Sequence, residues 1–303
     1  GTQSITTGFS PDLVWIKSRT NAVAHQLVDA IRGTDSYLFS DSNSEAGIVF
    51  DRVTSFDADG FTLGADAPGR VNANGSDYVA WCWDAGDTTV TNNEGTIESQ
   101  VRSNGTFSIV KYTGNSTDAS YGHGLSSAPA FILTKNLNTR SEDWVTYHSS
   151  TGLQYMSLNN GIAASNASNI WNSAPSNSVI NIGSSVNVNT DIDYISYCWA
   201  ESPVIDCGFE PAFVIIKRID GTQSWDLYDN VRSTSNPRNK ILFADTPDPE
   251  IENSAYDIDF TSTGFTPGDS NGATNAAGNV YIYAAFAGSQ DATTLTLTDN
   301  TDL

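Results

Sequence analysis

The sequence predicts an all-β protein built from three tandem, diverged antiparallel β-sandwich units of jelly-roll-like type. Three observations lead there: an internal repeat, short segments rich in Val, Ile, Thr and aromatic residues, and Gly, Pro, Asn, Asp and Ser between those segments. At 303 residues the chain has room for two or three domains of ordinary size. We expect the three units to pack with pseudo-three-fold symmetry; the alternative is beads in a row.

The first element of each unit is a strand that begins near a Pro and ends near a Lys six positions later. It spans Pro11–Lys17, Pro129–Lys135 and Pro211–Lys217. The residues between the two ends are mostly apolar, with β-branched and aromatic side chains that favour strands. The constant spacing places the three segments at the same position of the repeat.

The second element follows eight or nine residues after each Lys, where His25, Trp144 and Trp225 occupy equivalent positions. Residues 22–31 of the first unit alone have a plausible helical period. The equivalent segments, Trp144-Val-Thr-Tyr and Trp225-Asp-Leu-Tyr, favour a strand, and we predict a strand in all three units.

The last element of each unit is a strand rich in aromatic and small residues. It spans Tyr78–Trp83, Tyr194–Trp199 and Tyr281–Phe286. Cys82, Cys198 and Ala285 then occupy one buried strand position, which explains these cysteines as small apolar side chains. Three cysteines without regular spacing form no disulfide framework, although a bond between Cys198 and Cys207 stays open.

These elements divide the chain into three units and two flanking segments. The middle unit gains a strand at 106–114, and the alternating residues 294–298 form an amphipathic strand that belongs to no unit. The predicted boundaries are 1–86 for the first unit, 87–104 for a polar linker, 105–203 and 204–289 for the second and third units, and 290–303 for a strand leading into a further module or tail.

The charge balance narrows the classes of partner. Lys and Arg number 14 against 35 Asp and Glu, a formal net charge of −21, so the surface repels nucleic acid and anionic lipid. No apolar run approaches the roughly 20 residues that cross a bilayer. Such acidity is common on proteins that stay soluble outside a cell. The N-terminus lacks a secretion signal, so we expect export by another route or a longer parent chain.

Several stretches carry a resemblance to a known family. They are Gly8–Lys17, Asp57–Gly64, Tyr78–Trp83, Gly105–Asn115, Gly122–Leu125 and Tyr194–Glu201. In them the chain resembles a recurrent module of tail-fibre and other tail proteins of marine bacteriophages, the cyanophages and their relatives, over most of residues 7–288. The resemblance implies a virion structural or host-contact role and no chemistry. The third unit departs from it by lacking the strand found at Tyr112–Asn115.

No residue pattern in the chain predicts catalysis. The sequence contains no Gly-x-Ser-x-Gly elbow, no phosphate-binding loop, no His-Glu-x-x-His and no Cys-x-x-Cys. Of the three histidines, His25 and His148 stand at repeat positions that hold Trp and Asp elsewhere, and His123 lies in a loop. We therefore predict no catalytic residues, with a tailspike glycan depolymerase built on convergent carboxylates as the minor alternative.

We predict no cofactor, with calcium as the one ion to weigh. The acidic loops that offer oxygen ligands hold Asp57 and Asp59 in one case and Asp191 and Asp193 in the other. Neither loop completes a calcium-binding pattern, and Asp-x-Asp-Gly is also ordinary turn chemistry before a strand.

Glycan binding is the better case for a ligand, because sugar C–H faces stack on aromatic rings. The candidate ligand-binding residues are Trp144, Tyr147, His148, Trp171, Trp225 and Tyr228. Packing in each unit's core is the competing explanation for Trp144 and Trp225.

The function predicted from these observations is a non-enzymatic segment of a phage tail fibre or similar appendage, located in the virion and extracellular. Its expected partners are other virion proteins and a host cell-surface glycan, with neither nucleic acid nor membrane. By analogy with fibres we expect a homo-oligomer, with a trimer favoured. A lectin-like receptor-binding module is the alternative.

Overall fold

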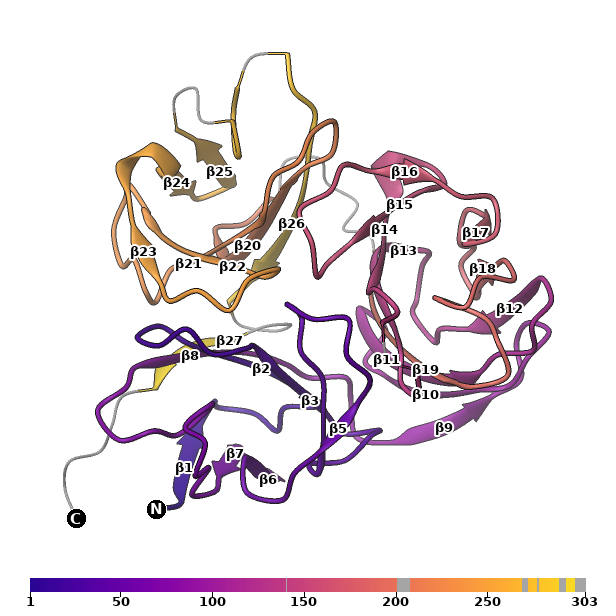
Figure 1. Cartoon of the computed structure of the whole chain (residues 1–303), viewed down its shortest axis with the longest axis horizontal. Helices are drawn as coiled ribbons and strands as arrows, with labels where there is room; N and C mark the ends of the chain where they lie inside the picture. The colour runs from indigo at the N-terminus through magenta and orange to yellow at the C-terminus, as the bar shows by residue number, and fades with distance from the viewer. Residues whose placement is uncertain (140, 201–207, 269–271, 277, 289–292, 298–303) are drawn as a thin grey trace.

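The computed structural model describes residues 1–139, 141–200, 208–268, 272–276, 278–288 and 293–297 (Figure 1). Apart from two 3-10 turns, η1 (Ser149–Thr151) and η2 (Ser254–Tyr256), all of its regular elements are strands, and all of their pairings are antiparallel. The predicted all-β, sandwich-like fold is confirmed.

Each unit contributes one large sheet that faces the middle of the molecule. The first has the order β3 (Gln26–Asp29), β2 (Leu13–Ser18), β8 (Tyr78–Trp83), β27 (Thr293–Leu297). The second runs β16 (Ser165–Asn166), β15 (Gln154–Ser157), β14 (Val145–His148), β13 (Pro129–Asn136), β19 (Asp193–Ala200), β11 (Phe107–Thr113), β10 (Ser99–Ser103), β9 (Thr89–Asn92). The third runs β23 (Ile251–Glu252), β22 (Lys240–Phe243), β21 (Trp225–Asp229), β20 (Pro211–Arg218), β26 (Tyr281–Ala287).

Smaller sheets and hairpins accompany each large sheet. In the first unit they are β1 (Gln3–Thr6), β7 (Gly60–Leu63) and β6 (Val53–Asp57), with the hairpin β4 (Ser36–Tyr37) and β5 (Gly47–Ile48). In the second they are β12 (Ala119–Gly122), β18 (Val179–Ile182) and β17 (Trp171–Ser173), and in the third β24 (Ile258–Thr261) and β25 (Gly264–Pro267).

Strand register confirms the equivalence of the repeats. Cys82 pairs with Val14, Cys198 with Ile132, and Ala285 with Val214. The three small residues therefore hold one position of the fold, as the sequence predicted. Cys82 and Cys198 are free, buried thiols, and Cys207 lies outside the described residues.

The inner strands are buried on both faces, and this explains their continuous apolar runs. All six residues of β2 are buried: Leu13 and Trp15 point to one core, while Val14 and Ile16 point to another. The second set forms a core within the first unit. The other units have their own cores in the same place, around Ile180 and Ile258.

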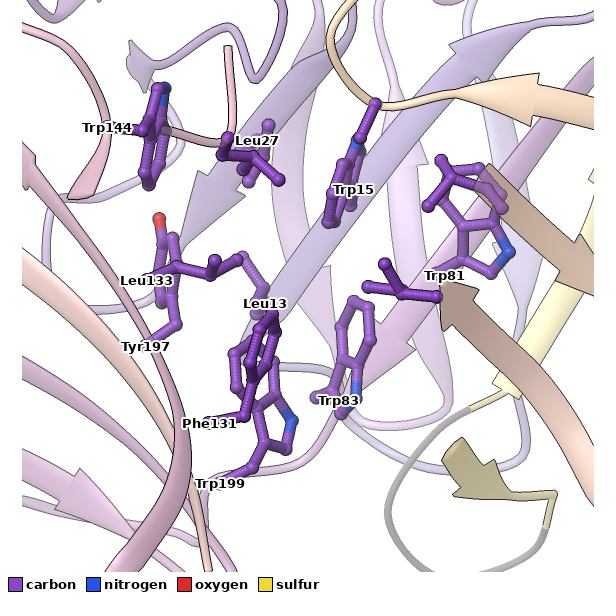
Figure 2. Close-up of a cluster of buried hydrophobic side chains, with 14 of the residues drawn as sticks. Leu13, Trp15, Leu27, Trp81, Trp83, Phe131, Leu133, Trp144, Tyr197 and Trp199 are labelled. Carbon is purple, nitrogen blue, oxygen red and sulfur yellow. The ribbon is translucent and has the colours of Figure 1, made fainter. Parts of the chain in front are cut away.

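The first set belongs to a core shared by all three units (Figure 2). Trp83 of the first unit meets Trp199 of the second at 5.7 Å and Phe213 of the third at 6.1 Å between ring centroids. Trp199 and Phe286 close the circle at 5.6 Å. Because each large sheet lends one face to this core, the units meet around a common centre and are not beads in a row.

Equivalent backbone hydrogen bonds join the units in a ring. The amide of Ala46 donates to Leu137 O (3.1 Å), that of Ala164 to Ile219 O (2.9 Å), and that of Glu250 to Arg19 O (2.9 Å). These bonds join first to second, second to third, and third to first unit. The arrangement has the expected pseudo-three-fold symmetry, visible as three lobes in Figure 1.

Two expectations about the flanking segments are wrong. Residues 87–104 are not a linker, since they contain β9 and β10, which extend the second unit's large sheet. Within β10, Ser99 and Val101 are buried and Gln100 is exposed, the alternation of a half-buried strand. Polar composition concealed this pattern.

The strand expected at 294–298 is present as β27, but it does not stand apart from the units. It pairs antiparallel with β8, from Thr293 opposite Cys82 to Leu297 opposite Tyr78 (Figure 1). It therefore takes the place on the first sheet that β11 takes beside β19 on the second. An alternating pattern predicts a half-buried strand, but it does not identify the distant strand with which that strand pairs.

Candidate functional site

The aromatic residues predicted to bind a ligand do not form a surface. Five of the six are buried: Trp144 0%, Tyr147 4%, Trp171 2%, Trp225 1% and Tyr228 0% exposed. They lie in three different cores, with Trp144 and Trp225 in the shared core rather than in the core of their own unit. None of these five rings can stack on a sugar while the protein is folded.

Trp144 and Trp225 instead tie neighbouring units together. Trp144 Nε1 donates to Phe39 O of the first unit (2.7 Å), and Trp225 Nε1 donates to Ser157 O of the second (2.9 Å). His25 makes the third bond of this set, between its Nε2 and Phe243 O of the third unit (2.9 Å). One repeat position thus supplies a ring N–H to each of the three junctions.

The hydrogen bonds of His25 fix its tautomer. Trp15 Nε1 donates to His25 Nδ1 (2.8 Å), so the ring proton sits on Nε2 and is donated to Phe243 O. Burial, followed by the nearby Lys17 cation, lowers the pKa of His25 well below its ordinary value. A neutral imidazole with both nitrogens occupied is a structural group rather than a free base.

The other histidines are used in the same way. His148 Nδ1 accepts from Ser150 N (3.2 Å), and its Nε2 bonds Tyr283 O of the third unit (3.0 Å). His123 Nδ1 accepts from Leu125 N (3.1 Å), and its Nε2 bonds Ser176 O (3.1 Å). His148, a predicted ligand contact, is therefore another link between units.

The Lys of each opening strand is buried, and in the second and third units it links to the preceding unit, a role that the sequence did not predict. Lys135 Nζ donates to Glu142 O (2.7 Å) and to Asn43 O of the first unit (3.3 Å). Lys217 Nζ likewise reaches Gly161 O of the second unit (3.1 Å). Burial lowers the pKa of Lys17, Lys135 and Lys217 to about 8.

Two buried ion pairs also lie at the junctions. Asp29 accepts from Arg32 Nε (2.5 Å) and from the hydroxyl of Tyr197 in the second unit (2.8 Å). Asp229 and Arg232 pair at the same spacing in the third unit, where the guanidinium lies 5.7 Å from the ring centroid of Trp81. Sequence reasoning missed both pairs, although the Asp-x-x-Arg spacing recurs.

Asp226 in the third unit is a buried carboxyl group without a hydrogen-bond partner. Both side-chain oxygens of Asp226 are unpaired, and the residue is fully buried. Burial, and then the neighbouring Asp245, raises the pKa of Asp226 well above its ordinary value. Gln26 and Val145 hold this position in the other units, and Gln26 accepts a hydrogen bond from Arg52 (2.6 Å).

The predicted calcium candidates are engaged elsewhere or exposed. Asp57 accepts from Ser55 and Thr62 (2.8 Å each), and Asp193 pairs with Lys111 (2.9 Å), while Asp59 and Asp191 are exposed. Within the described ranges, no three His, Cys, Asp or Glu side chains gather as a metal site. The loop that holds Asp57 and Asp59 needs glycine at position 60, because a Cβ there would lie 1.8 Å from Ile5 O.

A surface pocket of about 380 Å³ lies at the junction of the first and second units. It was not predicted, since its residues lie outside the strands that define the repeat. Its lining consists of Tyr37, Phe39, Asn43, Ser44, Glu45, Ala46 and Gly47 from the first unit and Ser141 from the second. This mixture of rings, amide, carboxylate and hydroxyls can bind a polar ligand with an apolar face.

Comparison with known proteins gives one match. A family model described as a domain of unknown function, DUF7483, matches residues 1–289. No curated protein and no solved structure matches the chain. No helix in the described part of the chain is long and apolar enough to cross a membrane.

Proposed function

We propose that this chain, which belongs to the DUF7483 family, is a non-enzymatic structural module of a phage virion appendage such as a tail fibre. Located in the extracellular virion, it would contact other virion proteins and the host surface. The resemblance of Gly8–Lys17, Asp57–Gly64 and Tyr78–Trp83 to cyanophage tail proteins supports this role.

The single observation that favours a structural role is the use of polar and aromatic groups at the junctions. The ring N–H groups of His25, Trp144 and Trp225 bond backbone carbonyls of neighbouring units. Two of the equivalent lysines, Lys135 and Lys217, do the same with their ammonium groups. Groups that an enzyme would leave available to a substrate here stabilise one packed arrangement.

The expected homotrimer remains part of the proposal, and it needs a surface other than the shared core. Three units of one chain already bury that core around Trp83, Trp199 and Phe213. A trimer would therefore associate through outer faces. Light scattering across concentration distinguishes a stable trimer, expected for a fibre segment, from a monomer, expected for a decoration module.

Immunogold electron microscopy tests the virion role directly. Antibodies against the purified chain should label one place on particles of the phage that carries this gene, and peptide mass spectrometry should find the chain in those particles. Particles that neither bind the antibody nor contain the chain would reject the proposal.

A glycan depolymerase is the enzymatic alternative. It predicts that the purified chain releases reducing ends from host polysaccharide. We expect no release above the level of the heat-denatured protein, and release that follows enzyme concentration would replace the structural role with a catalytic one.

Glycan binding is the second candidate function, and the pocket at the first junction is the observation that favours it. The pocket combines two rings with amide, carboxylate and hydroxyl groups. Such a combination can recognise a host-surface sugar without chemistry.

A further inference from the structure

We infer that the pocket between the first and second units is a binding site for a neutral oligosaccharide. This inference rests on the host-contact part of the proposed function. The aromatic residues first expected to serve a sugar are buried, so a glycan site must be built from other residues. Tyr37 and Phe39 are both half-buried and line the pocket.

The pocket is held in shape by both units. Three bonds anchor the loop from Phe39 to Gly47 to the second unit: Trp144 Nε1 to Phe39 O (2.7 Å), Lys135 Nζ to Asn43 O (3.3 Å), and Ala46 N to Leu137 O (3.1 Å). A site fixed before the ligand arrives loses little conformational freedom on binding, which favours affinity.

Its two rings are fixed as well. The Tyr37 and Phe39 centroids lie 5.0 Å apart with a 60° tilt, and the Arg52 guanidinium sits 4.2 Å from the Tyr37 centroid. Gly47 lets the Tyr37 ring lie against the backbone, since a Cβ there would be 2.3 Å from Tyr37 Cζ. The ring positions are therefore set by packing and not by rotamer freedom.

Pseudo-symmetry shows that this chemistry is particular to one junction. The equivalent loops of the other units are aligned by their Ala164 and Glu250 amides. Of the three loops, the first alone combines an aromatic pair with a carboxamide and a carboxylate. Tyr37, Phe39, Asn43 and Glu45 correspond to Tyr155, Ser157, Gly161 and Ala163 in the second unit and to Ile241, Phe243, Pro247 and Pro249 in the third.

The segment that follows the pocket exposes large apolar side chains only in the first unit. Ile48 is 74% and Phe50 72% exposed. The same positions hold Asn166 and Ser168 in the second unit and Glu252 and Ser254 in the third. An exposed ring beyond the pocket offers a further sugar residue a face to stack on, as an extended oligosaccharide requires.

The charge selects among sugars. Glu45 lines the pocket, while the Arg52 and Arg70 guanidinium groups lie 4.2 and 5.5 Å from the Tyr37 and Phe39 ring centroids, so the local charges are of both signs. The net charge of −21 on the whole chain disfavours the approach of uronates, sialic acids and sulfated sugars. Neutral hydroxyls, in contrast, can donate to the Asn43 and Glu45 oxygens and accept from the Asn43 amide. The volume of about 380 Å³ lies within the usual range for small-ligand sites.

The test is an array of neutral oligosaccharides of glucose, galactose, mannose and N-acetylhexosamines beside a uronate-containing set, followed by titration of the best neutral probe. The blocking variant is Asn43→Trp, which fills the pocket from an exposed position. Its matched control is Pro247→Trp, at the same position of the third unit's loop and also exposed. Thermal unfolding of both variants verifies that the fold is kept.

We expect neutral probes to bind, Asn43→Trp to weaken binding at least tenfold, and Pro247→Trp to leave it unchanged. If a glycan binds and Asn43→Trp has no effect, the pocket assignment is wrong while host contact through glycans stands. Binding of acidic glycans alone overturns the ligand class. No binding to any probe overturns the inference, and immunogold labelling of particles then decides the virion role separately.

Discussion

The junction of the first and third units and that of the second and third are built on the same plan from different side chains. In the third unit, Ile215 on the opening strand and the large ring of Trp225 both lie in the shared core. In the first unit, the ring of Trp15 on the opening strand contacts the smaller ring of His25, with 5.8 Å between centroids. Trp15 Nε1 donates to the imidazole of His25, and the imidazole in turn donates to Phe243 O of the third unit. The large ring lies on the opening strand in the first unit and on the following strand in the third unit, while the inter-unit hydrogen bond is kept. The exchange therefore roughly conserves side-chain volume.

Removing the ring of Trp225 should give the largest change in the free energy of unfolding. Trp225→Ala deletes a side chain that is 1% exposed and its bond to Ser157 O, leaving a cavity at the junction of the second and third units. We expect a loss of about 3–5 kcal/mol in the free energy of unfolding, measured by urea denaturation. Val280→Ala, at a half-exposed site, is the control; a loss below about 1 kcal/mol for Trp225→Ala would mean that the shared core is loosely packed.

Placing a second large ring at the first junction tests the exchange itself. His25→Trp alone should overpack the site beside Trp15 and cost about 1–3 kcal/mol in the free energy of unfolding. Adding Trp15→Leu copies the second unit, where Leu133 and Trp144 hold these positions, and should recover most of the loss. A double variant as unstable as the single one would show that the two positions do not compensate.

A smaller, opposite effect is expected beside Trp225. Asp226→Val copies Val145 of the second unit and removes a fully buried carboxyl with no partner, which should stabilise the protein by about 1–2 kcal/mol at pH 7. The folded-state pKa of Asp226 is raised, so its cost appears as pH rises above the ordinary carboxyl pKa of about 4. The gain measured by urea denaturation should therefore shrink toward pH 4, and an equal gain at both pH values would show that the carboxyl does not titrate in this way.

An effect of similar size is the acid dependence of the first junction. The lowered pKa of His25 means that the unfolded chain binds a proton that the folded chain does not. Stability should therefore fall below about pH 6.5, by at most about 1.4 kcal/mol per pH unit. The wild type should lose more between pH 6.5 and 5 than the His25→Trp, Trp15→Leu double variant, and identical slopes would contradict it.

That comparison is needed because other charged groups surround His25. Lys17 and Arg232 oppose its protonation, while the Asp41 carboxylate accepts its backbone N–H at 3.1 Å. Burial raises the pKa of Asp41 to about 6, so this carboxyl titrates in the same range with the opposite sign. Both chains keep these groups, and the difference between them isolates the imidazole.

Repeat alignment predicted the fold and the equivalence of positions. It placed His25 with Trp144 and Trp225, and Cys82 with Cys198, and the strand registers agree. It did not predict which core each ring enters, because an inner strand with two apolar faces carries no periodic signal that separates them. For that reason the sequence offers the core of each unit, and not the shared core, as the packing explanation for Trp144 and Trp225.

The pocket between the first and second units could not be predicted from the sequence, for a different reason. The pocket joins a first-unit loop to Ser141, about a hundred residues away, and its rings lie on a two-strand hairpin outside the repeat landmarks. Conversely, three of the predicted ligand contacts, Trp144, His148 and Trp225, are links between units. The other three, Tyr147, Trp171 and Tyr228, are buried in the cores of single units. Only the packed arrangement separates Tyr37, which lines a pocket, from Tyr147, which is buried.

The pairing of β27 with β8 sets the order in which the molecule can be completed. β8 ends at Trp83 and β27 begins at Thr293, about 210 residues later. Synthesis proceeds at roughly 5–20 residues per second, so about 10–40 s pass between the synthesis of β8 and that of β27, the strand that covers its edge. Throughout that interval β8 presents unpaired backbone groups, the usual starting point of aggregation, so nascent chains need that edge shielded until β27 has been synthesised.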